Sequence, residues 1–214
     1  KIFTQYRVKT VLDVGCGTGR HAFPLSKLGY QVVGIDQSKS FIAAARESAT
    51  IGDLAVAFEA SDMRDFKLAQ QFDAAMCMFT SFGYFDRAQG NQRVLTQIAL
   101  HLKRNGILIL DLNNFFRTTW NIAQLPNANY QKQTITASEQ TRLSNNIMLR
   151  TEHTIDLCSM RWCMRKIWRQ KKKRKSYHTS VQLYLYPELK HMLGKSGFRV
   201  TGMFGDFNAS IYSP

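Results

Sequence analysis

The sequence predicts an α/β fold: a doubly wound, mostly parallel sheet carrying an antiparallel β insertion. In the first half, short apolar runs alternate with segments of helical periodicity, a pattern typical of parallel strands joined by helices. From about Phe115, near-alternating apolar and polar residues in strand-rich composition indicate antiparallel strands. A length of 214 residues, 44% of them hydrophobic, suits one globular domain with a sizeable insertion.

The first half is expected to supply five parallel strands and the helices between them. The strands are predicted at Val11–Val14, Val32–Ile35, Ala55–Glu59, Phe72–Met78 and Gly106–Leu112. The first helix is expected to start near Arg20 and to stop at Gly29, because glycine favours helix ends. Ser38 is a typical N-cap for the second helix. A further helix is predicted from about Gln89 to Leu102.

The second half is expected to form the insertion and then return to the core. Its strands are predicted at Asn129–Ala137, Asn146–Asp156, Met160–Gln170 and Ser176–Tyr186. Pro187 suits the first turn of a helix that ends by Gly194 and Gly197, and Phe198–Phe204 is predicted as a sixth core strand. We therefore expect a core domain over residues 1–114, the β-rich insertion over 115–186, and a C-terminal helix and strand over 187–214 that complete the core.

A glycine-rich loop follows the first predicted strand. Gly15, Gly17 and Gly19 occupy alternate positions there, and glycine allows positive φ and a close approach of the backbone to a ligand. Free N–H groups at the start of the following helix add a positive field. Asp36 ends the second strand, where a carboxylate is placed to accept hydrogen bonds from ribose hydroxyls. These features predict a nucleoside-cofactor site, and the triplet alone leaves a nicotinamide cofactor open.

The residues around the loop narrow the choice of cofactor. Leu12–Gly19 resembles the first motif of the class I methyltransferases that depend on S-adenosylmethionine (SAM), a family with a Rossmann-like sheet. Phe58–Phe66, Phe72–Tyr84 and Leu102–Leu112 resemble the family's later motifs, in the same order. The resemblance covers roughly residues 8–114. It implies SAM as the cofactor, residues 1–114 as the SAM-binding core and the insertion as a cover for the acceptor site.

The resemblance also implies which residues bind SAM. The loop would lie against the methionine part, Asp36 would hold the ribose, and Asp62 would accept from the adenine amino group. Asp13 has two interpretations: it hydrogen-bonds loop amides, or it lies near the cofactor's ammonium group. The full predicted set is Asp13, Gly15, Cys16, Gly17, Gly19, Arg20, Asp36, Gln37, Asp62, Met63, Met78, Phe79 and Phe82.

The catalytic residue cannot be read from the sequence. Methyl transfer from a sulfonium is an in-line displacement, so the protein chiefly aligns the reactants, and some acceptors also need a base. Tyr84, Asn113 and Arg117 are weak candidates, because they follow the fourth and fifth strands. His101 is interpreted as structural. The structural interpretation is also favoured for His153 and His178, with lining of the acceptor pocket by one of them as the alternative.

The acceptor is predicted to be a small molecule, methylated on nitrogen or oxygen. Phe79-Thr80-Ser81-Phe82 stands where enzymes that methylate exocyclic base amines carry an Asn/Asp-Pro-Pro-aromatic tetrad. The Pro-Cys and Thr-Cys pairs of enzymes that methylate base carbons are absent from the sequence. The segments around Asp62 and Phe79 instead resemble small-molecule methyltransferases, including those that act on sugar amines.

The formal net charge of +14 leaves two alternatives open. Between Arg150 and Lys175, ten Lys or Arg residues oppose two acids, a local balance of about +8. The run Arg169–Lys175 suits an RNA or protein methyltransferase, although a solvated hairpin tip is the favoured interpretation, so nucleic acid is not the favoured partner. A SAM-binding module without catalysis is the other alternative.

Cysteine usage and hydropathy indicate the compartment. The four cysteines are scattered without metal-ligand spacing, which predicts reduced thiols, no metal site and a cytoplasmic protein. No apolar run reaches the length of a membrane span, and no secretory signal opens the sequence. Because the sequence starts just before the first strand and stops soon after Phe204, we expect the family's N-terminal helix and final strand to be missing from it.

Overall fold

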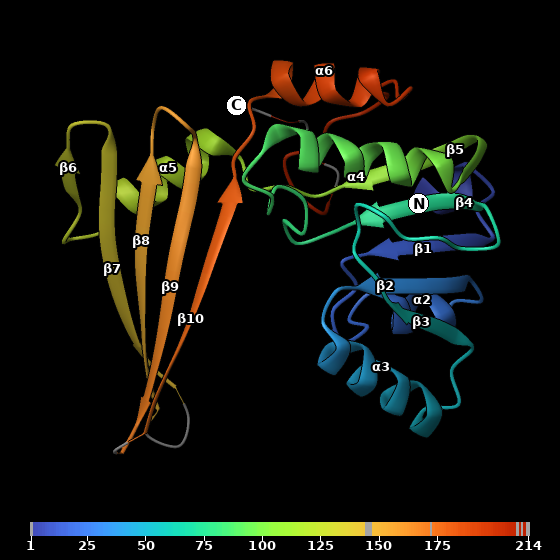
Figure 1. The fold of residues 1–214 in the computed structure, drawn as a ribbon, viewed down its shortest axis with the longest axis horizontal. Helices are drawn as coiled ribbons and strands as arrows, with labels where there is room; N and C mark the ends of the chain where they lie inside the picture. The colour runs from blue at the N-terminus through green and yellow to red at the C-terminus, as the bar shows by residue number, and fades with distance from the viewer. Residues whose placement is uncertain (1, 144–146, 172, 209, 211, 213–214) are drawn as a thin grey trace. The chain divides into compact units, whose positions relative to one another are not determined.

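The fold comprises two compact units, each built around a sheet of its own (Figure 1). It was obtained as a computed structural model, which describes residues 2–143, 147–171, 173–208, 210 and 212. The first unit contains the chain up to Phe82 together with Arg87–Leu112 and Met192–Arg199. The second contains Gly83–Asp86, Asn113–His191 and the chain from Val200 onward.

The first unit holds a five-stranded sheet in the order β3-β2-β1-β4-β5. Its strands are β1 Thr10–Val14, β2 Gln31–Asp36, β3 Val56–Ala60, β4 Phe72–Cys77 and β5 Leu102–Leu110. Every neighbouring pair is parallel, which confirms the predicted fold class. After β3 the chain crosses to the other side of β1, so the carboxyl ends of β1 and β4 flank the point where ligands bind in such sheets.

The helices are α1 Ile2–Gln5, α2 Ala22–Lys27, α3 Lys39–Ile51, α4 Ala88–Leu100, α5 Phe115–Ala123 and α6 Tyr186–Lys195. Three of the helices, α3, α4 and α6, lie close to predicted positions, whereas α1 and α5 were not predicted. Ser38 caps α3 as expected, because its side chain accepts the Phe41 N–H. The expected helix start near Arg20 is wrong: residues 18–21 form turns, and α2 begins at Ala22.

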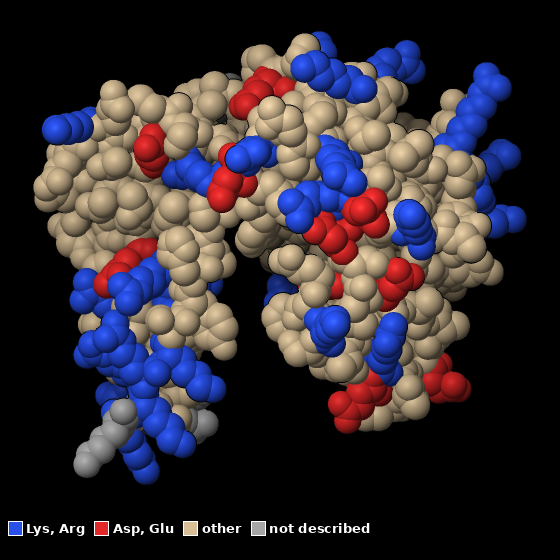
Figure 2. Space-filling model, viewed as in Figure 1, with Lys and Arg blue, Asp and Glu red and all other residues tan. Residues whose placement is uncertain are grey.

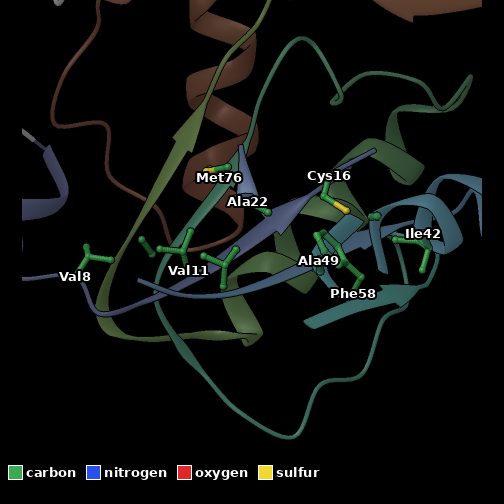
Figure 3. Packing of buried hydrophobic residues seen from close by; sticks show 11 residues of the cluster. Val8, Val11, Cys16, Ala22, Ile42, Ala49, Phe58 and Met76 are labelled. Carbon is green, nitrogen blue, oxygen red and sulfur yellow. The ribbon is translucent and has the colours of Figure 1, made fainter. Parts of the chain in front are cut away.

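The core of the first unit lies between its sheet and its helices. Val11 and Met76 from the strands pack in one cluster with Ala22 and Ile42 from the helices (Figure 3). Phe58 belongs to the same cluster and contacts the Phe23 ring edge-to-face. These contacts hold the strand ends, and therefore the loops that follow them, in fixed positions.

The amino-terminal ends of β1, β4 and β5 are joined through the carboxylate of Asp73. One oxygen, Oδ2, accepts the backbone N–H groups of Lys9 and Thr10, each at 2.9 Å, and the Thr10 hydroxyl at 3.0 Å. The other, Oδ1, pairs with Lys103 Nζ at 2.8 Å. Burial by itself would raise the pKa of Asp73, but the hydrogen bonds from Lys103, Thr10 and Lys9 outweigh it and lower the pKa.

The fifth strand starts earlier than predicted. The helix was expected to run to Leu102 and the strand to begin at Gly106, but α4 ends at Leu100 and β5 begins at Leu102. Leu102 lies opposite Phe72 and Ile107 lies opposite Ala74, so β5 bulges between them. Asn105 adopts a φ of 62° within this bulge, a conformation that asparagine tolerates better than most residues.

The second unit holds a five-stranded antiparallel sheet in the order β10-β9-β8-β7-β6. Its strands are β6 Asn129–Gln131, β7 Thr134–Arg142, β8 Met148–Asp156, β9 Arg161–Gln170 and β10 Lys173–Gln182. The single strand predicted over 129–137 is therefore two strands, joined by a turn in which Lys132 has a φ of 51°. The basic run lies where β9 turns into β10, as expected for a hairpin tip, although Lys172 falls outside the described residues.

One face of this second sheet packs against α5. Ile122 from the helix forms a buried cluster with Ile135, Ala137 and Ile155 from β7 and β8. Further along the chain, the strand predicted over 198–204 is absent, and Phe204 forms only an isolated bridge. None of the side chains from Phe198 to Phe204 is buried, so pairing there would gain little apolar burial. None of the helices in the described part of the chain has the length and apolar character needed to span a bilayer.

Candidate cofactor-binding site

The glycine loop after β1 turns sharply and is anchored to the neighbouring strand β2. Gly15, Gly17 and Gly19 have φ values of 75°, 57° and 90°. The N–H groups of Gly15 and Cys16 both donate to the carbonyl of Ile35 on β2, at 2.8 and 3.0 Å. The loop is therefore fixed to the carboxyl end of β2 by backbone hydrogen bonds.

The three glycines meet different surroundings. A Cβ added at Gly15 would lie 2.7 Å from Ser81 Cβ, and one at Gly19 would lie 2.7 Å from the Phe23 ring. A Cβ at Gly17 would meet no atom within 4 Å. Gly15 and Gly19 are thus required by packing inside the protein, whereas Gly17 borders open space beside the loop.

The carboxylate of Asp36 lies beside Gly17 of the loop. Its Oδ2 accepts the Gly17 N–H at 2.9 Å, and its Oδ1 accepts the Ser38 N–H at 2.8 Å. Each carboxylate oxygen has two acceptor sites, so both oxygens retain one for a ligand hydroxyl. The structure thus places Asp36 beside Gly17, at the end of β2 where the ribose site was predicted.

Asp13 is a buried acid at the end of β1. Its side chain is 1% exposed, and its Oδ2 has no hydrogen-bond partner among the described residues. Burial, reinforced by the charge of Asp36, raises the pKa of Asp13 to about 7. The loop amides donate to Asp36 and Ile35, so the interpretation in which Asp13 holds the glycine turn is not what the structure shows.

Cys16 and Phe82, both predicted to bind the cofactor, have buried side chains. Cys16 packs into the core of the first unit, where a Cβ on Gly34 would approach its Sγ to 2.8 Å (Figure 3). Burial raises the pKa of the Cys16 thiol, and the charges of Asp13 and Asp36 add to this. Phe82 is fully buried, so its ring presents no open surface to a ligand.

Asp62 already has a partner in the loop after β3. Its carboxylate accepts the backbone N–H of Arg64 at 2.8 Å and pairs with the Arg64 guanidinium at 2.6 Å. These hydrogen bonds lower the pKa of Asp62. Met63 lies between them in sequence, and its Cε would be 3.7 Å from a Cβ on Gly15, so this loop reaches the glycine loop. Arg64 was not predicted, although its position two residues after Asp62 is a usable signal.

The loop after β4 carries a strained pair of residues. Phe79 and Thr80 have φ values of 52° and 56°, which is costly for residues other than glycine. Asp111, which follows β5, holds them: its Oδ2 accepts the Phe79 N–H at 2.8 Å and its carbonyl accepts the Thr80 N–H at 3.0 Å. Asp111 was not among the predicted site residues, although an acid directly after a strand is a recognisable signal.

An exposed aromatic side chain results from this strain. The Phe79 ring is 56% exposed and lies 5.0 Å from the Arg20 guanidinium and 5.3 Å from the His21 ring. Arg20 therefore lies over the Phe79 ring. The structure brings the loops after β1 and β4 together here, with Ser81 Oγ also 3.4 Å from the Gly15 carbonyl.

The remaining predicted residues lie at varied positions. Gln37 is exposed and Met78 is half-buried. Tyr84, Asn113 and Arg117 belong to the second unit, where Arg117 donates its N–H to the Asn114 cap of α5. Their part in catalysis stays a prediction.

The histidines interpreted as structural have ordinary partners where the structure resolves them. His101 Nε2 accepts the Leu68 N–H at 3.2 Å, and Nδ1 lies 2.8 Å from the Gln97 carbonyl. The His101 ring contacts the Phe66 ring at a tilt of 34°. His153 is buried and receives the Trp162 indole N–H. His178 is exposed.

A family comparison shows what this loop arrangement resembles. Residues 11–106 match the sequence profile of a family described as "Methyltransferase domain". This part of the chain is similar to that family. The match spans the glycine loop, Asp36, Asp62 and the Phe79 loop, and it confirms the resemblance seen in the sequence.

Two curated methyltransferases are similar in sequence to about half of this chain. A glycine/sarcosine N-methyltransferase of Aphanothece halophytica is 32% identical over 117 residues, which is 54% of this chain and 44% of that protein. A dTDP-3-amino-3,4,6-trideoxy-alpha-D-glucopyranose N,N-dimethyltransferase of Streptomyces venezuelae is 30% identical over 102 residues, which is 48% of this chain and 41% of that protein. The chain thus spans less than half the length of these curated relatives.

Solved structures share the fold along almost the whole chain. The CcbJ methyltransferase from Streptomyces caelestis superposes with a TM-score of 0.83 at 18% identity, covering 99% of this chain and 82% of that one. CalS10, an amino pentose methyltransferase from Micromonospora echinaspora, gives a TM-score of 0.71 at 19% identity, covering 97% and 85%. The similarity in fold therefore extends beyond residues 11–106 to the second sheet.

Proposed function

We propose that this chain binds SAM and transfers its methyl group to a nitrogen or oxygen atom of a small molecule. The observation that carries the proposal is the open space at Gly17, directly above Asp36 at the switch point of the parallel sheet. The family match over residues 11–106 supports the methyl-transfer chemistry. The relatives are named for glycine/sarcosine, aminated dTDP-sugars and ubiquinone biosynthesis, which supports a small-molecule acceptor.

Each loop has a role in this proposal. The backbone around Gly17 lies against the methionine part, and Asp36 accepts hydrogen bonds from the ribose through its two remaining acceptor sites. Asp62 accepts from the adenine amino group, in exchange for part of its pairing with Arg64. Phe79, held by Asp111, covers the methyl-bearing end. When bound, SAM supplies an activated methyl group, and the protein's part is alignment.

Calorimetric titration with S-adenosylhomocysteine tests the cofactor assignment, with NAD as the control ligand. We expect micromolar binding of S-adenosylhomocysteine and none of NAD. Asp36→Ala and Asp62→Ala should each weaken the affinity by about 1–3 kcal/mol, because each removes hydrogen bonds to the ligand. Binding of NAD alone, or unchanged affinity in both variants, would overturn the assignment. Mass spectrometry of amine and hydroxyl acceptors incubated with SAM then tests turnover.

A glycine pair gives a sharper test of the loop. Gly17→Ala adds a methyl group to the space proposed for the cofactor, and it should lower the affinity for S-adenosylhomocysteine at least about tenfold, a loss of about 1.4 kcal/mol. Gly29→Ala is the matched control, because Gly29 also has positive φ, at 88°, and a Cβ there also meets no atom within 4 Å. Both variants carry a similar backbone cost, so equal affinities in the two would place the cofactor elsewhere.

A further inference from the structure

The second sheet carries a set of arginines on one face, away from its apolar cluster with α5. Side chains alternate between the faces of a strand, and the register places Arg169 on β9 opposite Arg174 on β10 and opposite Met148 on β8. Arg142 on β7 lies opposite Met148 in turn. We call the exposed set formed by Arg142, Arg150, Arg165, Arg169 and Arg174 the arginine face.

The arginine face is short of negative charge. Glu152 lies on this face, 3.1 Å from Arg150 and 3.9 Å from Arg165. Neither Arg169 nor Arg174 has an acidic partner within the described part of the chain. Like charges directly opposite each other on neighbouring strands destabilise a sheet, so an external anion would relieve this pair.

The arginine pair borders a small surface pocket. Arg150, Arg169 and Arg174 line this pocket together with Gln140, Met148, Glu152 and Ile167. In the space-filling view, Lys and Arg side chains gather at the end of this sheet where β9 turns into β10 (Figure 2). Such a spread of exposed guanidinium groups suits an extended polyanion better than one small ion, which needs an enclosed site.

Aromatic side chains lie on the other face of the same hairpin. Trp168 and Tyr177 contact each other edge-to-face at 4.9 Å, and Tyr177 is 60% exposed. β10 is an edge strand of its sheet, so a flexible chain is able to pass round this edge from the arginines to the aromatic pair. Exposed aromatic rings beside a basic track are the combination that binds single strands, because every base has a face on which to stack.

We propose that the arginine face, together with Trp168 and Tyr177, binds single-stranded nucleic acid through its phosphodiester backbone, without sequence preference. Guanidinium groups bind phosphate oxygens in a bidentate manner, and the aromatic pair provides the stacking that an acidic protein partner would not use. The residues of this proposed site differ from those proposed to bind SAM, which all belong to the first unit.

Fluorescence anisotropy with a labelled single-stranded RNA of about 15 nucleotides tests the proposal. We expect binding that weakens steeply between about 50 and 200 mM salt. R169Q/R174Q should weaken binding at least about tenfold and reduce the slope of log affinity against log salt by about 1.4, because each single-strand phosphate contact contributes about 0.7. Tyr177→Ala should weaken binding and leave the salt slope unchanged.

A matched control separates this site from general charge. K67Q/R104Q removes the same charge from exposed positions of the first unit and should change RNA affinity less than about twofold. Equal weakening by both double variants would overturn the site, as would an absence of RNA binding at low salt. Tighter binding of poly-glutamate or of vesicles containing phosphatidylserine would instead assign the face to an acidic protein or a membrane. Thermal unfolding of R169Q/R174Q should show no loss of stability, because the substitutions remove a repulsion.

Discussion

At the scale of single residues, Asp13 is a buried acid whose pKa is raised well above its usual value. A buried carboxyl oxygen without a hydrogen-bond partner is costly when charged, and the neighbouring Asp36 adds to the cost. The pKa of about 7 means that Asp13 exchanges its proton near neutral pH. A cation bound at the glycine loop would favour its charged form.

Replacing Asp13 by Asn should change how stability depends on pH. Between the ordinary value of 3.8 and about 7, folded Asp13 holds a proton that the unfolded chain releases, so stability falls as pH rises through this window. The fall is on the order of 4 kcal/mol at most. Asp13→Asn stays neutral, so its stability relative to the parent should grow between about pH 4 and pH 7, as measured by urea unfolding. The exposed Asp53→Asn is the control, and a parallel pH profile for both variants would contradict the role of burial.

Residue identities were easier to predict than their partners. The positions of Asp36 and Asp62 follow from strand ends, which hydrophobic runs reveal. Their contacts with Gly17 and Arg64 depend on how short loops fold, and no periodicity encodes that. Phe82 was expected to line the site because it follows the fourth strand, and its burial depends on packing that the sequence does not display.

At the scale of elements, Asp73 shows how the sheet is fixed at the end opposite the site. One carboxylate joins the start of β1 to β5 and satisfies N–H groups that precede the parallel ladder. This junction aligns β1 with β4. The carboxyl ends of these two strands carry the glycine loop and the Phe79 loop.

Asp73→Asn should destabilise the first unit by about 1–2 kcal/mol at neutral pH, because it removes the charge that Lys103 pairs with. The pKa of Asp73 is lowered on folding, so its contribution is present above the unfolded value of 3.8 and is lost as pH falls below it. Chemical unfolding at about pH 7 and pH 3 measures both. Asp65→Asn, at an exposed 3.6 Å pair with Arg93, should cost less than about 0.5 kcal/mol, and a cost equal to that of Asp73→Asn would contradict this account.

Helices and strands were predictable where the burial of one face produced a regular pattern of apolar residues in the sequence. The parallel strands and the capped helix α3 follow from apolar runs and from Ser38. The turn between β6 and β7 was not predicted, because the residue with positive φ there is Lys132 and not the glycine or asparagine that usually indicates such a turn. The segment 198–204 has the alternation of a strand and forms none, because alternation without burial does not stabilise pairing.

At the scale of the whole molecule, positive charge is the dominant property. A formal net charge of +14 repels itself in the folded state, and much of it lies on and around the β9–β10 hairpin. We therefore expect the unfolding temperature to rise by a few degrees between about 20 and 300 mM NaCl, as this repulsion is screened. Scanning fluorimetry measures the shift. R169Q/R174Q lowers the net charge by two and should show a smaller rise, whereas a fall with salt would indicate that attractive pairs dominate.

The bulge in β5 has a consequence for how such chains tolerate changes of length. Leu102 and Ile107 of β5 are five positions apart, but their partners on β4, Phe72 and Ala74, are only two positions apart. This stretch of β5 therefore contains three residues more than regular pairing needs. We expect an inserted or deleted residue near Asn105 to be absorbed there, with the regular pairing from Ile107 to Leu110 keeping its register. A change in length between α4 and β5 would then leave Asp111, which holds the strained Phe79–Thr80 turn, in place.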